Sequence, residues 1–117
     1  QSSAGLALVC LSVRSGFDAL LQALALPPGS EVVMTSITIP HMVELVETHG
    51  LRVVPVAVDP VSLSVTPEAL ERAIGPATRL IVVSHLLGSR MPMAPIAAIA
   101  DRYGIPVVED CAQAFQG

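Results

Sequence analysis

Lysine is missing from this sequence, because all six cationic side chains among its 117 residues are arginine. A phosphate-binding GxxxxGK(S/T) loop is therefore excluded, since that loop requires a lysine. The sequence also lacks a GxGxxG dinucleotide motif and a GxSxG nucleophile elbow. Standard P-loop, Rossmann and serine-hydrolase functions are accordingly disfavoured.

Charge and cysteine are also scarce. Only 14% of the residues are charged, the net charge is −4, and there is no basic cluster. We therefore expect no nucleic-acid partner and no anionic membrane partner, because proteins bind both of these through basic surfaces. The two cysteines, Cys10 and Cys111, show no CxxC spacing, which favours free buried thiols in a cytoplasmic protein over a disulfide or a metal site.

Long hydrophobic runs are missing, although 52% of the residues are hydrophobic. The longest early run, residues 4–11, is too short to span a bilayer and lacks the basic flank of a signal peptide. Such an apolar composition suggests that part of the surface packs against a further segment or a partner. The sequence has no initiator methionine and stops at Gly117. We interpret residues 1–117 as part of a single domain, truncated at its C-terminus and also at its N-terminus.

Helical and strand patterns alternate along the chain. Apolar residues with helical spacing begin after Gly16, Pro40, Pro67 and Pro95. Short apolar runs predict strands at 31–35, 52–58, 80–83 and in the run that leads to Asp110. Pro55 places the second of these strands at a sheet edge or in a bulge. The alternation predicts an α/β fold, with a mostly parallel sheet that carries helices on both faces.

Asp110 follows an apolar run at residues 105–108. In open α/β sheets, ligands bind outside the carboxyl ends of the strands. An acid at such an end, followed three residues later by the amide of Gln113, indicates a ligand-facing edge. The alternative is that Glu109 and Asp110 only end the strand and face water.

Two other polar segments lie next to predicted elements. Ser15-Gly16 opens a helix, where free N–H groups and the helix dipole can hold an anion, although many such helix starts bind nothing. His85 follows the strand at 80–83 and is either catalytic or a structural hydrogen-bonding residue. His49 is interpreted as an ordinary residue on the packed face of its helix.

Several segments together resemble one known family. Residues 109–114 (EDCAQA) resemble the EDAAQA signature of the DegT/DnrJ nucleotide-sugar aminotransferases, which are pyridoxal-phosphate enzymes of fold type I. Similar matches join residues 15–20 (SGFDAL) to SGTxAL, 28–32 (PGSEV) to PGDEV, 36–38 (SIT) to SxT, 59–70 (DPVSLSVTPEAL) to DxxxLxxxPEAL, and 85–88 (HLLG) to HLYG. Their order and spacing agree along nearly the whole chain.

The resemblance implies roles for individual residues. The acid at Asp110 would pair with the pyridine nitrogen of pyridoxal phosphate and keep it protonated, because a nearby opposite charge favours the charged form. The amide at Gln113 would lie near the phenolic oxygen of the cofactor. Ser15, Gly16 and the N–H groups after them would hold the phosphate. His85 matches a further cofactor-binding position.

Two cofactor-binding positions depart from the family pattern. Phe17 stands where the family has a phosphate-binding threonine, and its helical spacing places it on the core face. Ile39 stands where an aromatic residue can stack on the cofactor ring, so apolar contact remains but stacking does not. The lysine that binds the cofactor covalently lies beyond residues 109–114 in this family. We therefore expect no catalytic residue in this chain, which alone would be inactive.

The resemblance implies part of the large domain of a fold-type-I aminotransferase. The parent enzyme would be a cytoplasmic homodimer without a metal, and it would transfer an amino group from a donor such as glutamate to a keto-sugar nucleotide. Two alternatives stay open. One is a dehydratase or a non-catalytic member of the same fold. The other is a small α/β domain that binds Mg²⁺ through Glu109, Asp110 and His85.

Overall fold

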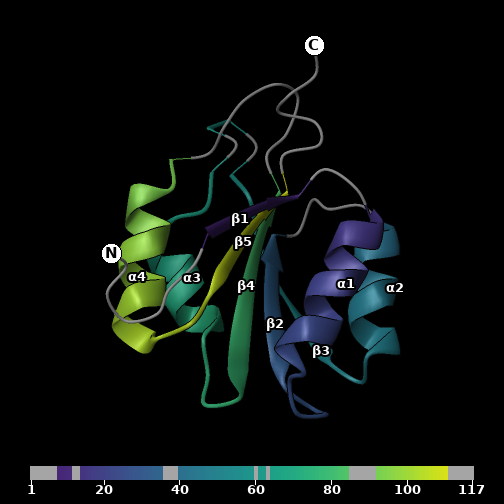
Figure 1. The fold of residues 1–117 in the computed structure, drawn as a ribbon. Coiled ribbons are helices and arrows are strands. Elements are labelled where there is room, and N and C mark those ends of the chain that lie inside the picture. Colours follow the sequence, from purple (N-terminus) through teal and green to yellow (C-terminus); the bar gives the residue numbers. More distant parts are fainter. Residues whose placement is uncertain are drawn as a thin grey trace.

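The structure is a computed structural model that describes residues 8–11, 14–35, 40–59, 61–62, 64–84 and 92–110. Strands and helices alternate along it, as Figure 1 shows. The elements are β1 (Leu8–Leu11), α1 (Arg14–Leu24), β2 (Glu31–Thr35), α2 (Pro40–Thr48), β3 (Arg52–Val56), α3 (Pro67–Ala73), β4 (Thr78–Ser84), α4 (Ala94–Tyr103) and β5 (Val107–Asp110).

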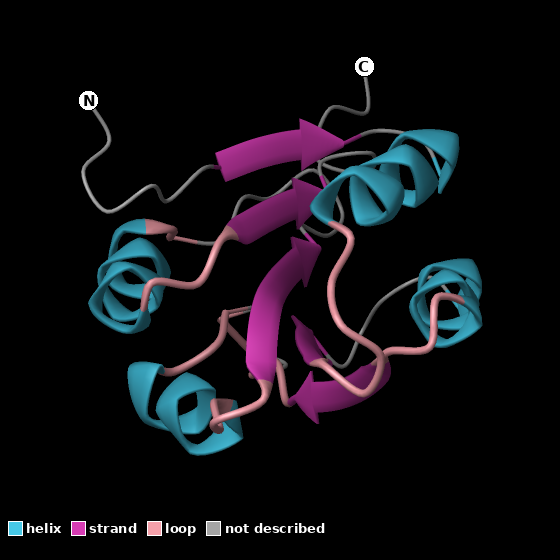
Figure 2. Ribbon diagram, turned by 60° about the horizontal axis from the view of Figure 1, so that its bottom comes forward, coloured by secondary structure: helices cyan, strands magenta, loops and turns pink. Residues whose placement is uncertain are grey.

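The strands form one parallel sheet in the order β1-β5-β4-β2-β3. Helices lie on both sides of this sheet (Figure 2), with α1 and α2 on one face and α3 and α4 on the other. The predicted α/β fold is confirmed. Pro55 lies in β3, an edge strand of the sheet, as its missing N–H group requires.

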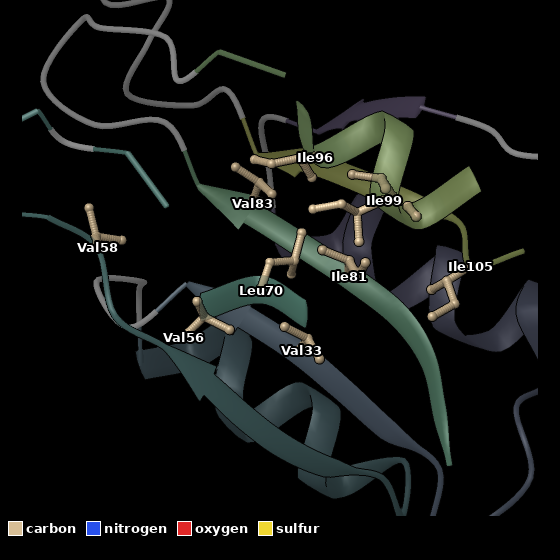
Figure 3. Packing of buried hydrophobic residues seen from close by; sticks show 11 residues of the cluster. Val33, Val56, Val58, Leu70, Ile81, Val83, Ile96, Ile99 and Ile105 are labelled. Carbon is tan, nitrogen blue, oxygen red and sulfur yellow. The ribbon is translucent and has the colours of Figure 1, made fainter. Parts of the chain in front are cut away.

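Each face of the sheet has its own hydrophobic core. Strand side chains alternate between the faces, so Val32 and Met34 pack toward α1 and α2 while Val33 packs toward α3 and α4. Figure 3 shows the cluster between the sheet and the helices α3 and α4, in which Leu70 and Ile96 lie against the sheet. Strands buried on both faces explain why β2 and β4 are almost continuously apolar in sequence.

Local capping explains where the helices begin and end. The Thr66 hydroxyl accepts a hydrogen bond from the Ala69 amide at 3.1 Å, and Pro67 occupies the first helical position of α3. α4 ends at Gly104, whose φ of 68° lies in the left-handed region that glycine adopts without strain. α1 begins at Arg14, two residues before the predicted start.

The prediction for His49 differs from the structure. His49 lies just after α2 and is only partly buried, and its Nε2 is 2.8 Å from Oδ1 of Asp18 in α1. It therefore joins two helices by a polar contact instead of packing into the core. Among the described residues, the strongly exposed large hydrophobic side chains are Val61 and Tyr103. The prediction that part of the surface packs against a further segment or a partner stays a prediction.

Candidate functional site

The chain changes direction along the sheet between β2 and β4. After β2 it passes through α2 to the edge strand β3, and it returns through α3 to β4 on the other side of β2. The helices that follow these two neighbouring strands, α2 and α4, cover opposite faces. Such a reversal opens a crevice outside the carboxyl ends of the strands, where ligands of open α/β sheets bind. The candidate site is therefore the edge of the sheet where β2 and β4 end (Figure 1).

Asp110 lies at this edge, at the end of β5 and beside β4. Its Cα is in register with that of Ser84, the last residue of β4. Val108 packs toward α1 and α2, so Asp110, two residues later, lies on the same face of the sheet. By the same alternation, Glu109 lies on the face of α3 and α4, together with Val107.

The alternative that Glu109 and Asp110 face water is wrong. Each residue is only 7% exposed, and each has interaction partners in the structure. Carboxylates are seldom this buried unless their environment compensates for lost hydration. The burial of Asp110 at the carboxyl end of a central strand therefore favours a ligand-facing role over a simple strand end.

Two further polar residues end the strands at the reversal point. Thr35 ends β2 and Ser84 ends β4, and both are buried. The Ser84 amide donates a hydrogen bond to the Thr35 hydroxyl oxygen at 3.3 Å. Sequence reasoning did not select Thr35, although it is a polar residue at the end of an apolar strand, the same signal that identified Asp110.

The first turn of α1 begins three residues after β1 ends, at the same edge of the sheet. It contains Ser15 and Gly16, which were predicted as an anion-binding helix start, and Phe17. The first N–H groups of a helix lack intrahelical acceptors and attract anions. Gly16 is half-buried, whereas the Phe17 side chain is fully buried in the core between α1, α2 and the sheet. Phe17 therefore offers no side-chain contact to a ligand at this helix start.

The other predicted site residues, Ile39, His85 and Gln113, lie outside the described residues. Within the described ranges, no group of three or more His, Cys, Asp or Glu side chains is placed to hold a metal ion. None of the helices in those ranges has the length and hydropathy needed to cross a bilayer.

A small cavity lies below this edge, between the sheet and the helices α3 and α4. Its volume is about 10 Å³, and its lining includes Thr35, Leu70 and Ile96. This is room for one water molecule at most, and the lining is almost entirely apolar, whereas a buried water needs two to four polar partners. The cavity is thus a gap in the packing and no substrate site.

The chain was compared with known proteins. Residues 4–117 match the model of the DegT/DnrJ/EryC1/StrS aminotransferase family. A UDP-2-acetamido-2-deoxy-3-oxo-D-glucuronate aminotransferase from Pseudomonas aeruginosa is 40% identical over 109 residues, which are 91% of this chain and 30% of that protein. The chain thus spans less than a third of this curated relative.

Solved structures agree with the sequence match. The sugar aminotransferase CalS13 from Micromonospora echinospora is 37% identical, with a TM-score of 0.75 over 87% of this chain and 30% of that one. NtdA from Bacillus subtilis, solved with bound cofactor PMP, is 35% identical, with a TM-score of 0.76 over 86% of this chain and 24% of that one. The family model covers nearly the whole chain, and the chain therefore belongs to the DegT/DnrJ/EryC1/StrS aminotransferase family.

Proposed function

We propose that this chain is the N-terminal part of the large domain of a pyridoxal-phosphate-dependent aminotransferase that acts on a keto-sugar nucleotide. The amino donor would be an amino acid such as glutamate. The observation that carries this proposal is the buried carboxylate of Asp110 at the carboxyl end of β5, next to the reversal point of a family aminotransferase fold. The names of the Pseudomonas relative and of CalS13, both sugar aminotransferases, support the substrate class.

The described residues fit the two ends of this cofactor. Its ring nitrogen needs an anionic partner, and Asp110 is a buried acid on the α1 face of the sheet. Its phosphate needs N–H donors and a positive field, and the first turn of α1 offers both. Gly16 has no side chain, so an anion can approach the backbone closely at this position.

The contribution of the chain to the chemistry would be electrostatic. When bound, pyridoxal phosphate supplies an electron sink for bond cleavage at the substrate amino-acid carbon. The Asp110 carboxylate would hold the proton at the ring nitrogen, because a nearby negative charge favours the protonated, cationic ring. The burial of Asp110 strengthens this interaction, since less water screens it.

The amine that binds the cofactor covalently would come from another part of the complete protein, because these 117 residues include no lysine. Arginine cannot replace it, because its guanidinium stays protonated and is not a nucleophile at neutral pH. We expect the isolated chain to show no glutamate-dependent amino transfer. Transfer by the pure chain would contradict this division of roles.

We further propose that the complete protein is a cytoplasmic homodimer. The dimer is implied by the family resemblance, and the cytoplasm suits two cysteines without CxxC spacing. Nothing in the structure favours the alternatives of a dehydratase or non-catalytic protein. For the magnesium-binding alternative, the described acids Glu109 and Asp110 lie on opposite faces of the sheet and form no described metal cluster.

The test compares two neighbouring acids in the complete protein. Asp110→Asn keeps the size of the side chain but removes its charge, and it should lower the rate of amino transfer at least about 100-fold, the usual loss when one preorganised electrostatic contact is removed. Glu109→Gln is the matched control, because Glu109 is equally buried but lies on the opposite face. We expect Glu109→Gln to retain transfer within a few-fold of the wild type, after correction for any loss of folded protein.

The measurements are glutamate-dependent transfer to a keto-sugar nucleotide, cofactor absorbance and circular dichroism of each variant. A folded Asp110→Asn protein with normal turnover would overturn the assignment of Asp110. Stabilisation of the wild type by Mg²⁺, with no effect of pyridoxal phosphate, would overturn the proposed function and favour the magnesium-binding alternative.

A further inference from the structure

We propose that Thr35 is a positioning residue of the cofactor site: its hydroxyl holds together the ends of β2 and β4 and thereby fixes the strand end that flanks Asp110. This inference rests on the function proposed above. It concerns a residue that does not need to touch the cofactor, and it is carried by one observed hydrogen bond at the reversal point of the sheet.

This hydrogen bond lies where the paired part of β2 and β4 ends. The register of β2 with β4 runs from Glu31 to Met34, which lies opposite Val82, and it includes no Thr35–Val83 pair. In a regular parallel ladder, the Ser84 amide would donate to a main-chain carbonyl of β2. Here the Thr35 side-chain oxygen accepts it at 3.3 Å, in a buried position. The hydroxyl thus extends the connection between two strands at the point where their register ends.

The chain leaves β2 and β4 toward opposite faces of the sheet. β2 and β4 continue into segments that lead to α2 on one face and to α4 on the other. Neighbouring strands with such connections separate at their carboxyl ends, and the crevice between them is the binding region of the fold. The contact between Thr35 and Ser84 adds a connection where the paired register ends, and it thereby opposes separation one residue deeper in the sheet. The Thr35 hydroxyl therefore defines the floor of the crevice.

The floor of the crevice is connected to Asp110 through Ser84. Ser84 receives the Thr35 contact through its amide, and its Cα is in register with that of Asp110 on β5. The Thr35 side chain lies on the face of α3 and α4, like that of Val33, and it acts on the main chain of Ser84. The Ser84 side chain, two residues after Val82, lies on the α1 face, the same face as that of Asp110. A displacement of the end of β4 would therefore shift the strand that packs directly beside Asp110. Electrostatic contacts of a catalytic site depend on such fixed geometry.

The sheet contains a matched control at its opposite edge. Thr78 begins β4, and its hydroxyl accepts a hydrogen bond from the Gly75 amide at 2.8 Å. Thr35 and Thr78 are 4% and 3% exposed, so both are buried threonines that accept one backbone N–H. They differ in their location, because Thr35 lies at the carboxyl edge and Thr78 at the amino edge of the sheet. Loss of either hydrogen bond should lower the stability of the protein, whereas only loss of the Thr35 bond should change the binding of the cofactor.

The experiment uses Thr35→Val and Thr78→Val in the complete protein, together with Thr35→Ser. Valine keeps the shape of threonine but cannot accept the hydrogen bond, whereas serine retains the hydroxyl. The first readout is the Kd for pyridoxal phosphate, obtained by titration of the cofactor-free protein. The second is hydrogen exchange of the Ser84 amide, which reports the bond directly.

We expect Thr35→Val to raise the Kd for pyridoxal phosphate roughly three- to tenfold, the range that corresponds to the loss of one net hydrogen bond. Exchange of the Ser84 amide should become faster in the same variant. Thr35→Ser should restore both values to within about twofold of the wild type, and Thr78→Val should leave both unchanged. If Thr35→Val does not fold, Thr35→Cys, which is a weak acceptor, replaces it.

Equal Kd values for Thr35→Val and Thr78→Val would overturn the inference and leave Thr35 as an ordinary core residue. Unchanged exchange at Ser84 in Thr35→Val would also overturn it. These results differ from a failure of the proposed function, which would appear as a wild-type protein that does not bind pyridoxal phosphate at all.

Discussion

Phe17→Thr is the substitution in which the family pattern and the structure predict opposite outcomes. A threonine at this position would restore the family's phosphate-binding hydroxyl. The structure, however, places the Phe17 side chain in the core, with no exposed surface. It belongs to the cluster between the sheet and the helices α1 and α2, together with Leu21, Met34 and Val108. The same change thus removes a core side chain and offers a possible ligand contact.

The magnitudes decide between these effects. Truncation of a buried phenylalanine to alanine costs about 3–5 kcal/mol, and threonine adds a hydroxyl that needs a hydrogen-bond partner in the same space. A hydroxyl–phosphate hydrogen bond returns about 1.5–3 kcal/mol at most, and only when the cofactor is bound. Because a domain of this kind has a total stability of about 5–15 kcal/mol, we expect Phe17→Thr to lower the free energy of unfolding severely and to give no net benefit.

The assay is urea unfolding of the complete protein, with and without pyridoxal phosphate. The unliganded curves report the loss of core packing, and the additional stabilisation by cofactor reports the change in affinity, since bound ligand stabilises by RT ln(1 + [L]/Kd). Phe17→Leu is the control, because it keeps an apolar side chain at the site and should recover most of the stability.

Two results would contradict this reasoning. If Phe17→Thr unfolded within about 1 kcal/mol of the wild type, the side chain could not be a core anchor, since complete burial of a phenylalanine is worth more than that. If Phe17→Thr remained folded and bound pyridoxal phosphate about tenfold more tightly, the side chain at position 17 would face the phosphate and the packing of α1 would be wrong.

Three further predictions concern stability, and each is measured by the free energy of unfolding in urea. Leu70→Ala should cost about 2–5 kcal/mol, near the upper end of that range, because Leu70 already lines a small cavity that would grow; a loss below 1 kcal/mol would contradict the packing of α3. Gly104→Ala should cost about 1–2 kcal/mol, because Gly104 has a left-handed φ of 68°. Gly75→Ala is the control and should be nearly neutral, because the nearest atom to an added Cβ would be 3.7 Å away. Thr66→Ala should cost about 1 kcal/mol through loss of the cap on α3, and Thr66→Ser should retain most of it.

The local features of the fold were predictable from the sequence because short-range physics determines them. The bounds of β2 agree with its predicted residues 31–35, since a short apolar run between polar residues has few other solutions. α3 begins at Pro67, where the helical spacing was predicted to begin, because the Thr66 side-chain acceptor and the fixed φ of proline act within one turn. Pro55 placed β3 at an edge for a similarly local reason.

Long-range pairing was not predictable in the same way. No pattern in the sequence shows that β4 inserts between β2 and β5, because any apolar strand can pair with any other. The reversal point between β2 and β4 depends on this strand order, so Thr35 and Ser84 could not be recognised as neighbours 49 residues apart. His49 was misassigned for a related reason, since its partner Asp18 lies on another helix.

The division between core and site follows from the geometry of the strands. Along β5, Val107 and Val108 supply one buried side chain to each face, and Glu109 and Asp110 continue the same alternation with carboxylates. The apolar residues of the strand thus stabilise the fold by packing into both cores. Because Glu109 and Asp110 continue the same strand, their positions and side-chain directions are fixed by that packing. A carboxylate placed by such a strand is held more rigidly than one on a loop. For this reason a single acid at the end of an apolar run, weak evidence by itself in the sequence, becomes a strong candidate once the sheet order places it beside the reversal point.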